Sequence, residues 1–98
     1  MSRLTSPGQI KGIMKKHNVR FSKSLGQNFI INDNIIEEII NRSNITKAVS
    51  VLEIGPGVGV LTQALAEHAD KVLAVEIDNK LIPVLEETLS GYENVSIL

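Results

Sequence analysis

At residues 49–59 the sequence reads VSVLEIGPGVG, and this stretch decides the fold. A β-branched apolar segment runs directly into a loop with glycine at alternate positions, Gly55, Gly57 and Gly59. The residues after the loop have apolar side chains at helical spacing, which predicts a helix. A strand, a glycine loop and a helix in this order are typical of the nucleoside- or phosphate-binding corner of a parallel α/β sheet. Glycine suits such a loop because it adopts dihedrals barred to other residues and lets a ligand approach the main chain.

The spacing of these glycines favours one class of nucleoside ligand. Dinucleotide binding requires the pattern G-x-G-x-x-G/A, but Val60 occupies the third position here and the third glycine comes one residue early. Pro56 fixes φ and removes an amide donor, which makes the turn a poorer site for a pyrophosphate. S-adenosylmethionine has no phosphate and needs only a loop that lies flat against its adenosine and methionine parts. The spacing therefore favours S-adenosylmethionine over a nicotinamide dinucleotide.

A second strand-like segment ends in carboxylates. Residues 72–78 read VLAVEID, and Glu76 lies 21 residues beyond Gly55. A doubly wound fold places the acid that binds ribose hydroxyls at this separation, and such a contact suits either cofactor. Glu53, inside the first strand, is either a second functional acid or a residue on a polar face. The sequence leaves both interpretations open.

Composition limits the possible classes of protein. A chain of 98 residues forms at most one small domain, and with only three aromatic residues its core has to be built from Ile, Leu and Val. Because cysteine is absent, we expect no disulfide and no thiolate metal site, which is consistent with a reducing compartment. The apolar runs are too short for a membrane span, and the N-terminus lacks the apolar core of a signal peptide. We therefore expect a cytoplasmic protein with no metal and no membrane contact.

Charge is divided unevenly along the chain. Residues 1–32 carry six cations and no acid, whereas residues 33–98 carry four cations and eleven acids. This asymmetry predicts a basic arm that faces nucleic acid, attached to an acidic ligand-binding core. The alternative is that the cations only keep the arm soluble. The candidate RNA-binding residues are Lys11, Lys15, Lys16, Arg20 and Lys23.

Two helices are expected ahead of the α/β unit. The first begins at Pro7, with Ser6 as its N-cap and Gln9 completing a capping box, and ends near residue 17. Residues 19–31 show no period and predict an ordered loop. A second helix, from residue 32 or 33 to about 42, carries isoleucines at 35, 36, 39 and 40 on one face.

The α/β unit itself is expected as alternating strands and helices. The strands are predicted at 49–54, at 71–77 and from 95 onward, and the helices at 58–69 and 79–89. Asn79 is the expected cap of the last helix, with Pro83 in its first turn and Gly91 at its end.

Three motifs resemble the ribosomal RNA adenine dimethyltransferases and fall in that family's order. They are KSLGQNFI at residues 23–30, followed by Asp33, then EIGPG at 53–57 and VEID at 75–78. The similarity covers residues from about 10 to 98. The family includes small-subunit dimethyladenosine transferases and the erythromycin-resistance methylases, and the basic N-terminal arm looks more like that of the former.

The resemblance implies a fold and an activity. The fold is α/β, a doubly wound parallel sheet of the Rossmann-like methyltransferase type, of which this chain is the N-terminal part, preceded by two helices. The activity is S-adenosylmethionine-dependent N6-dimethylation of adenines in small-subunit (16S) ribosomal RNA during ribosome biogenesis, with the small-subunit precursor as partner. The alternatives are a large-subunit methylase that confers macrolide resistance, a nicotinamide-dinucleotide domain, and a small RNA-binding module whose α/β unit is only scaffold.

The resemblance also implies roles for single residues. Asn28 and the main chain at Ile30 would touch the methionine end of the cofactor. Gly55 would lie against the same part, and Gly57 would shape the loop. Glu76 would accept both ribose hydroxyls, which agrees with the position of this acid after the second strand.

Several parts of the family pattern are absent from these 98 residues. They are the Asn-(Leu/Ile)-Pro-Tyr motif that holds the target adenine, the acid that contacts the cofactor's adenine, and the helical RNA-binding domain. We therefore expect catalytic residues beyond Leu98 and a fragment that is inactive alone, from a monomeric parent. The fragment would self-associate through an edge built of Val95, Ile97 and Leu98. Its expected organisation is a basic arm with a helix and a cofactor-closing loop at 1–32, then the first part of the cofactor-binding domain at 33–98.

Overall fold

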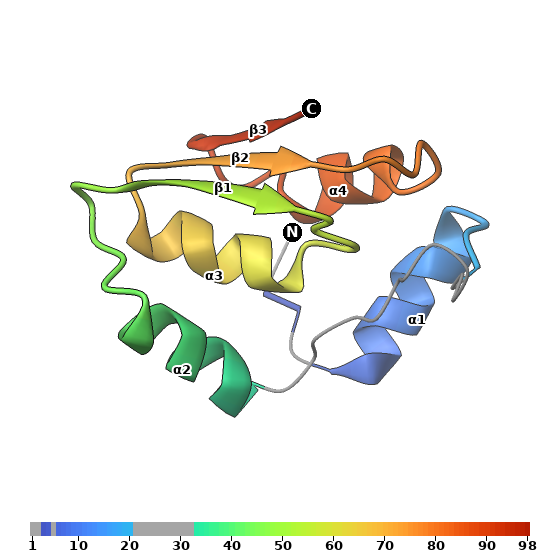
Figure 1. Cartoon of the computed structure of the whole chain (residues 1–98). Helices are drawn as coiled ribbons and strands as arrows, with labels where there is room; N and C mark the ends of the chain where they lie inside the picture. Colours follow the sequence, from blue (N-terminus) through green and yellow to red (C-terminus); the bar gives the residue numbers. More distant parts are fainter. Residues whose placement is uncertain (1–2, 5, 21–32) are drawn as a thin grey trace.

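The computed structural model describes residues 3–4, 6–20 and 33–98. Within this part of the chain, helices and strands alternate after two N-terminal helices (Figure 1). The elements, in chain order, are α1 (Pro7–Lys16), α2 (Asp33–Arg42), β1 (Ser50–Ile54), α3 (Val60–His68), β2 (Lys71–Val75), α4 (Ile82–Thr88) and β3 (Val95–Ile97). The two expected N-terminal helices are therefore confirmed.

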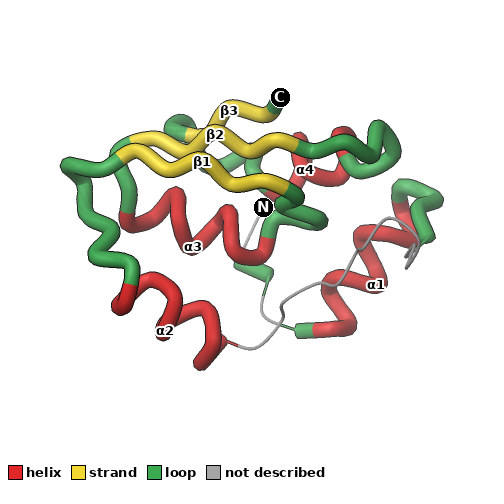
Figure 2. The backbone as a smooth tube through the Cα atoms, in the orientation of Figure 1, coloured by secondary structure: helices red, strands yellow, loops and turns green. Residues whose placement is uncertain are grey.

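The strands form a parallel sheet in the order β1-β2-β3. Leu52 of β1 pairs with Leu73 of β2, which in turn pairs with Ser96 of β3. Because parallel neighbours need a crossover connection, the chain returns through α3 and α4 between consecutive strands. Figure 2 shows both helices on the same side of the sheet. The expected α/β class with a parallel sheet is confirmed, and each strand begins and ends within two residues of its expected bounds.

The side of the sheet that faces these helices forms the core. Val72 of β2 is buried there in one cluster with Ala64 and Leu65 of α3 and Val84 of α4, and Ala74 of β2 is also buried. Helices α1 and α2 extend the same apolar cluster away from the sheet. Burial of aliphatic side chains therefore joins all four helices to a single core.

The opposite face of the sheet is apolar and exposed. Leu52 is 59 % exposed and Ile54 is 77 % exposed, because alternate residues of a strand point to opposite faces. By contrast, Val95 and Ile97 of β3 are half-buried, whereas Ser96 and Leu98 are exposed. β3 is the edge strand of the described sheet, as expected, but two of its three expected apolar side chains are partly covered. The exposed apolar surface is mainly a face of β1 and β2.

Helix α1 begins as the sequence predicts. The Ser6 side chain accepts the Gln9 backbone N–H, and the Gln9 side chain accepts the Ser6 backbone N–H (3.1 Å), which completes the capping box. Its apolar stripe, Ile10, Ile13 and Met14, is buried. These features fix both the start of the helix and the face that it turns to the core.

The isoleucines of α2 are not equally buried. Ile36 and Ile40 lie in the core, but Ile35 is 48 % exposed and Ile39 is half-buried. The four side chains lie within one face of the helix, as expected, but only two of them reach the core. Consecutive residues of a helix lie about 100° apart, so two adjacent pairs spread over a wider arc than one contact surface covers.

Helix α4 begins three residues later than expected. The Asp78 carboxylate accepts the Lys80 backbone N–H, and its carbonyl accepts the Leu81 N–H, so residues 78–81 form a turn. Leu81 is the N-cap and Pro83 lies in the first turn. The assignment of Asn79 as the cap is therefore wrong, and the placement of Pro83 is confirmed. The helix ends at Thr88, ahead of the expected Gly91.

The N-terminal segment is tied to α3 and α4. The Leu4 backbone N–H donates to the Gln63 side chain (2.8 Å), whose amide nitrogen donates to the Thr88 carbonyl (2.8 Å). Arg3 forms an ion pair with Glu67 (2.7 Å) beside this contact. In the part of the chain that the structure describes, no helix is long and apolar enough to cross a membrane.

Candidate functional site

The carboxyl ends of β1 and β2 meet at one edge of the sheet, as parallel neighbours must. The glycine loop at 55–59 follows β1, and residues 76–78 follow β2. The Gly55 N–H donates to the Val75 carbonyl (2.8 Å), which fixes the start of the loop against the neighbouring strand. Ligands of open α/β sheets bind at this edge, so the loop and the acid occupy the expected place.

All three loop glycines have positive φ angles: 74° at Gly55, 63° at Gly57 and 95° at Gly59. The backbone requirement inferred from the sequence is therefore confirmed. The space around the outer two differs. A Cβ at Gly55 would meet nothing within 4 Å, whereas a Cβ at Gly59 would lie 2.9 Å from the Thr88 hydroxyl oxygen. Gly55 thus leaves its main chain open, and Gly59 is needed for packing against α4.

The Glu76 carboxylate joins the two loops. Its Oε1 accepts the Gly57 N–H (3.1 Å), and its Oε2 accepts the Asp78 N–H (3.0 Å). The side chain is half-buried, so one part of it remains accessible to a ligand. The structure therefore brings Gly55, Gly57 and Glu76 together at the edge that the sequence predicts.

Each glycine amide of the loop already has an acceptor in the protein. Gly55 donates to Val75, Gly57 to Glu76, and Gly59 to the Pro56 carbonyl (3.0 Å). A loop that binds a pyrophosphate offers its N–H groups to the phosphate oxygens. In this loop the glycine N–H groups are bonded internally, and a carboxylate lies beside them. Both features disfavour a phosphate and suit a ligand with hydroxyl donors.

Glu53 lies beneath the loop, on the covered side of the sheet. It is half-buried and accepts a hydrogen bond from the Thr62 hydroxyl of α3. Burial raises the pKa of Glu53, the nearby Glu76 carboxylate raises it further, and the Thr62 hydrogen bond lowers it. Both interpretations left open by the sequence remain, because Glu53 lies near Glu76 and also bonds to a polar side chain of α3. Glu53 links β1 to the first turns of α3.

The basic residues of the N-terminal arm fall into two groups. Lys11, Lys15 and Arg20 are exposed on α1 and the segment after it, with no ion pair to another described residue. Lys16 is also exposed, but its ammonium lies 3.0 Å from the Glu87 carboxylate of α4. Lys23, Asn28 and Ile30 lie outside the described residues.

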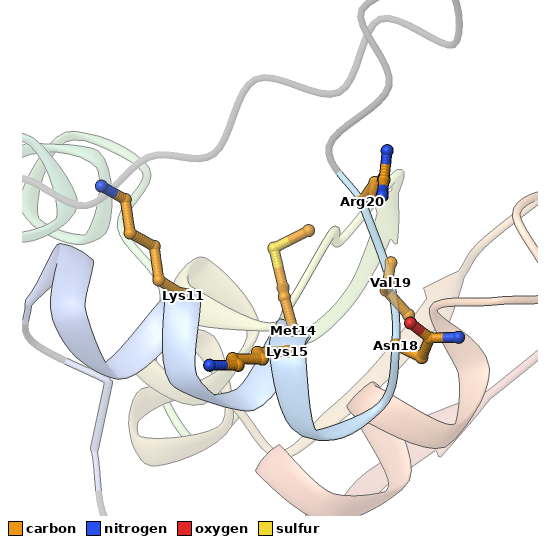
Figure 3. A pocket seen from close by; sticks show the side chains of 6 residues that line it. All are labelled: Lys11, Met14, Lys15, Asn18, Val19 and Arg20. Atoms are coloured by element: carbon orange, nitrogen blue, oxygen red, sulfur yellow. The ribbon is translucent and has the colours of Figure 1, made fainter.

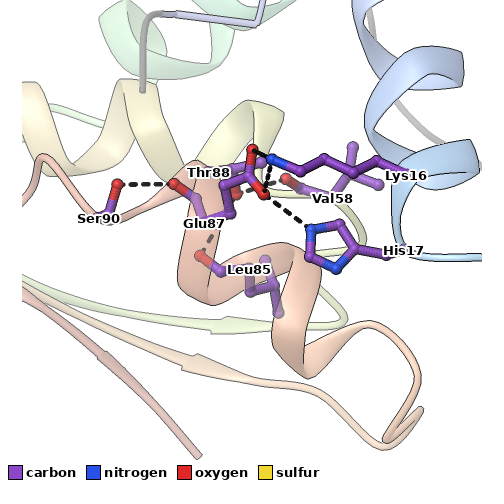
Figure 4. Close-up of polar contacts among 7 residues, drawn as sticks. All are labelled: Lys16, His17, Val58, Leu85, Glu87, Thr88 and Ser90. Carbon is purple, nitrogen blue, oxygen red and sulfur yellow. Dashed lines mark hydrogen bonds and ion pairs between the residues drawn. The ribbon is translucent and has the colours of Figure 1, made fainter.

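Glu87 is the contact between α1 and α4 that sequence reasoning missed. It lies 2.9 Å from the ring of His17, which is half-buried at the end of α1 (Figure 4). The hydrogen bonds from Lys16 and then from His17 lower the pKa of Glu87. These residues are about 70 positions apart, and no local pattern marks such a pair.

Thr88, next to Glu87, is a second contact without a local signal. Its side chain points back into the core, where the hydroxyl donates to the Val58 carbonyl (2.9 Å), as Figure 4 also shows. Thr88 is fully buried, so the hydrogen bond satisfies a polar group that would otherwise be costly. This bond and the Gly59 contact join the glycine loop to α4.

Comparison with known proteins is consistent with this geometry. Residues 10–98 match the family described as ribosomal RNA adenine dimethylase. The chain is 51 % identical over 98 residues to the ribosomal RNA small subunit methyltransferase A of Alkaliphilus oremlandii, covering all of this chain and 34 % of that protein. The chain thus spans about a third of the length of such relatives.

Solved structures give the same picture at lower identity. The crystal structure of the 23S rRNA methyltransferase ErmE is 38 % identical, with a TM-score of 0.68 over 72 % of this chain and 29 % of that one. A dimethyladenosine transferase from Plasmodium falciparum is 35 % identical, with a TM-score of 0.63 over 68 % of this chain and 25 % of that one.

Proposed function

Because the chain belongs to the ribosomal RNA adenine dimethylase family, we propose that it is the cofactor-binding part of an S-adenosylmethionine-dependent adenine N6-dimethyltransferase. The proposed substrate is small-subunit ribosomal RNA, modified in the cytoplasm during ribosome biogenesis. The chain spans a third of its curated relatives, so the residues that hold the target adenine are expected outside the matched third. The division into a basic arm at 1–32 and a cofactor-binding part at 33–98 belongs to the same proposal.

One observation carries the choice of cofactor. The Glu76 carboxylate lies beside the glycine loop, and the glycine N–H groups are already bonded within the protein. A carboxylate accepts hydrogen bonds from two neighbouring ribose hydroxyls, and glycine N–H groups that are already bonded are not available to a pyrophosphate. This arrangement supports S-adenosylmethionine and disfavours a nicotinamide dinucleotide.

The proposed roles follow from these positions. Glu76 accepts both ribose hydroxyls, Gly55 lies against the methionine part because its main chain is open, and Gly57 shapes the loop. The family resemblance adds Asn28 and the main chain at Ile30 on the methionine side. The bound cofactor supplies the methyl group, and these residues position it.

The cofactor proposal can be tested on the chain itself by NMR. Titration with S-adenosylmethionine should shift the backbone amides of Gly55, Gly57 and Asp78, while titration with a nicotinamide dinucleotide should leave them unchanged. NMR is suited to this because it detects the weak binding that we expect from part of a cofactor site. Equal shifts with both ligands, or shifts with the dinucleotide alone, would contradict the proposal.

The RNA proposal rests on the cations of the arm and on the relatives. Curated relatives near 50 % identity are small-subunit enzymes, which supports that substrate over the large-subunit alternative. The proposed contacts to RNA are Lys11, Lys15, Lys16, Arg20 and Lys23.

The substrate can be tested by joining this chain to the remaining two thirds of the Alkaliphilus oremlandii relative. The chimera should transfer labelled methyl groups to adenines of small-subunit ribosomal RNA and not of large-subunit RNA. A chimera that binds the cofactor but methylates only large-subunit RNA would overturn the substrate assignment.

A further inference from the structure

An open pocket of about 340 Å³ lies where α1 ends and the chain turns back (Figure 3). Its size is at the lower end of the roughly 300–1,000 Å³ that small-molecule sites occupy. The lining residues come from the last turns of α1 and the four residues after it. They are Lys11, Met14, Lys15, Asn18, Val19 and Arg20.

The end of α1 builds this pocket through a Schellman motif. Asn18 has a left-handed backbone, with φ of 56°, and its N–H donates to the Lys15 carbonyl (3.0 Å). The Val19 N–H donates to the Met14 carbonyl (2.8 Å). These two bonds are the pair that defines the motif, and they turn the chain back so that Arg20 stands beside the helix.

The pocket has an apolar base and a cationic rim. Met14 and Val19 are buried, at 8 % and 7 % exposed, and Figure 3 shows the Met14 side chain pointing into the pocket. The three cations Lys11, Lys15 and Arg20 stand around it, and none of its described lining residues is an acid. A cluster of like charges without a counter-charge is unfavourable on its own and favours an anion.

The neighbouring Lys16 differs from the three pocket cations because its charge has a partner. Its ammonium pairs with Glu87, so its charge is compensated within the protein. The pocket cations have no such partner among the described residues. A role in stabilising the helix end suffices to explain Lys16, and it leaves Lys11 and Arg20 unexplained because neither lies in the last turn.

We infer that this pocket, whose lining residues are not those of the cofactor corner, is a subsite for one nucleotide of a single-stranded RNA segment. The phosphodiester lies among Lys11, Lys15 and Arg20, with Arg20 able to bind two phosphate oxygens at once. The base or ribose lies over the apolar surface of Met14 and Val19. This subsite rests on the proposed function, since it names how the same RNA substrate is held.

The apolar base distinguishes a nucleotide from a free anion. Inorganic phosphate alone makes no favourable contact with the thioether of Met14 or the side chain of Val19, so these apolar groups add no affinity for it. A nucleotide uses both parts, because its phosphate is anionic and its base has a flat apolar surface. The pocket chemistry therefore favours the nucleotide.

The charge part of the inference predicts a change in salt dependence. For the whole chain with a short single-stranded RNA, the double variant K11Q/K15Q should flatten the plot of log affinity against log salt by about 0.7 for each phosphate that it no longer neutralises. The matched control is R42Q/K71Q, which removes the same charge from the end of α2, where Arg42 pairs with Glu38, and from the start of β2, neither of which lines the pocket. If the control flattens the slope equally, the effect is net charge alone and the subsite is overturned.

The nucleotide part is read from the methyl group of Met14. RNA should shift this NMR signal, whereas pyrophosphate at equal phosphate concentration should shift it much less. An equal response to pyrophosphate would reduce the pocket to an anion site and overturn the inference. Binding to phosphatidylserine vesicles that depends on Lys11 and Lys15, without any RNA response, would overturn it in favour of a membrane surface.

The outcomes also separate this inference from the proposed function. A cofactor response at Gly55 and Gly57 without an RNA response at Met14 would overturn the subsite and leave the proposed cofactor site standing. An RNA response at Met14 without a cofactor response would support the subsite and contradict the proposed cofactor.

Discussion

The cofactor corner and the α1 pocket differ in whether their polar and charged groups have partners within the protein. In the corner, the glycine N–H groups and the Glu76 carboxylate bond to groups of the protein itself before any ligand is present. In the pocket, the charges of Lys11, Lys15 and Arg20 have no counter-charge among the described residues. The corner is ordered by its own contacts, whereas the pocket gains its main stabilisation when an anion arrives.

This difference indicates what each region recognises. A corner with satisfied main-chain groups selects by shape and by a few hydroxyl donors, so salt should affect it little. A pocket of exposed cations selects by charge, so salt should weaken it strongly. Substitutions at five positions test how the corner and the elements around it are held together.

The largest effect is expected at Glu76. Glu76→Ala removes two charge-assisted hydrogen bonds to ribose and should cost on the order of 2–4 kcal/mol of cofactor affinity. Glu76→Gln should cost less than the alanine variant, because the amide oxygen still accepts, but its NH2 group then faces the N–H of Gly57 or Asp78. NMR titration or calorimetry measures both. If the alanine variant binds the cofactor with unchanged affinity, Glu76 does not contact the ribose. If the loss of affinity depends strongly on salt, the corner does not differ from the pocket in its salt dependence.

The next effect separates two glycines of the same loop. Gly59→Ala places a Cβ 2.9 Å from the Thr88 oxygen at a φ of 95°. It should lower the free energy of unfolding by about 2–3 kcal/mol. Gly55→Ala has open space and should cost only about 1 kcal/mol, from its backbone alone. Urea denaturation compares the two. If both variants lose a similar amount of stability, α4 shifts to make room for the new methyl group.

A smaller effect is expected from the buried carboxylate beneath the loop. Burial raises the pKa of Glu53, so the folded state holds its proton more tightly than the unfolded chain does. Its contribution to stability is complete in acid, below the usual pKa range of a glutamate, and is lost as the pH rises through the raised pKa. Glu53→Gln should therefore stabilise the protein at neutral pH and make no difference in acid.

Denaturation curves of both proteins between pH 3 and pH 8 measure this difference, and the range is chosen as roughly that over which carboxylates titrate. Glutamine keeps an acceptor for the Thr62 hydroxyl, so the comparison isolates the charge. A glutamine variant that is less stable at every pH would show that Glu53 does more than accept this one bond.

The smallest effect is expected where α1 meets α4. The hydrogen bonds from Lys16 and His17 lower the pKa of Glu87, so its contribution is present above the usual glutamate range and is lost as the pH falls through the lowered pKa. Glu87→Gln should slightly destabilise the protein at neutral pH, less so in high salt, and not at all in strong acid. A loss that persists in acid would point to packing rather than charge.

A contact could be predicted from the sequence when its residues are close in the chain or when the sheet topology brings them together. The glycine loop and Glu76 were predictable, because a parallel sheet brings the ends of successive strands together. The start of α1 was predictable for a similar reason, since Ser6 and Gln9 bond within one turn. The late start of α4 was not, because the Asp78 turn competes with the expected cap.

Contacts across long stretches of sequence left no readable pattern. Glu87 contacts Lys16 and His17 about 70 residues away, and nothing around any of them marks the pair. The α1 pocket was missed for a related reason. The sequence shows where the cations are, but only the turn at Asn18 places Arg20 beside Met14.

The close approach of Gly59 to Thr88 couples these two positions, so that a substitution at one changes the effect of a substitution at the other. Thr88→Ala alone removes the hydrogen bond from the Thr88 hydroxyl to the Val58 carbonyl, so it should lower the stability of the fold. After Gly59→Ala, the same change removes the colliding oxygen and becomes helpful. The double variant should therefore lose less stability than the two single losses added together. This one contact limits which side chains the end of the glycine loop and α4 can hold at the same time.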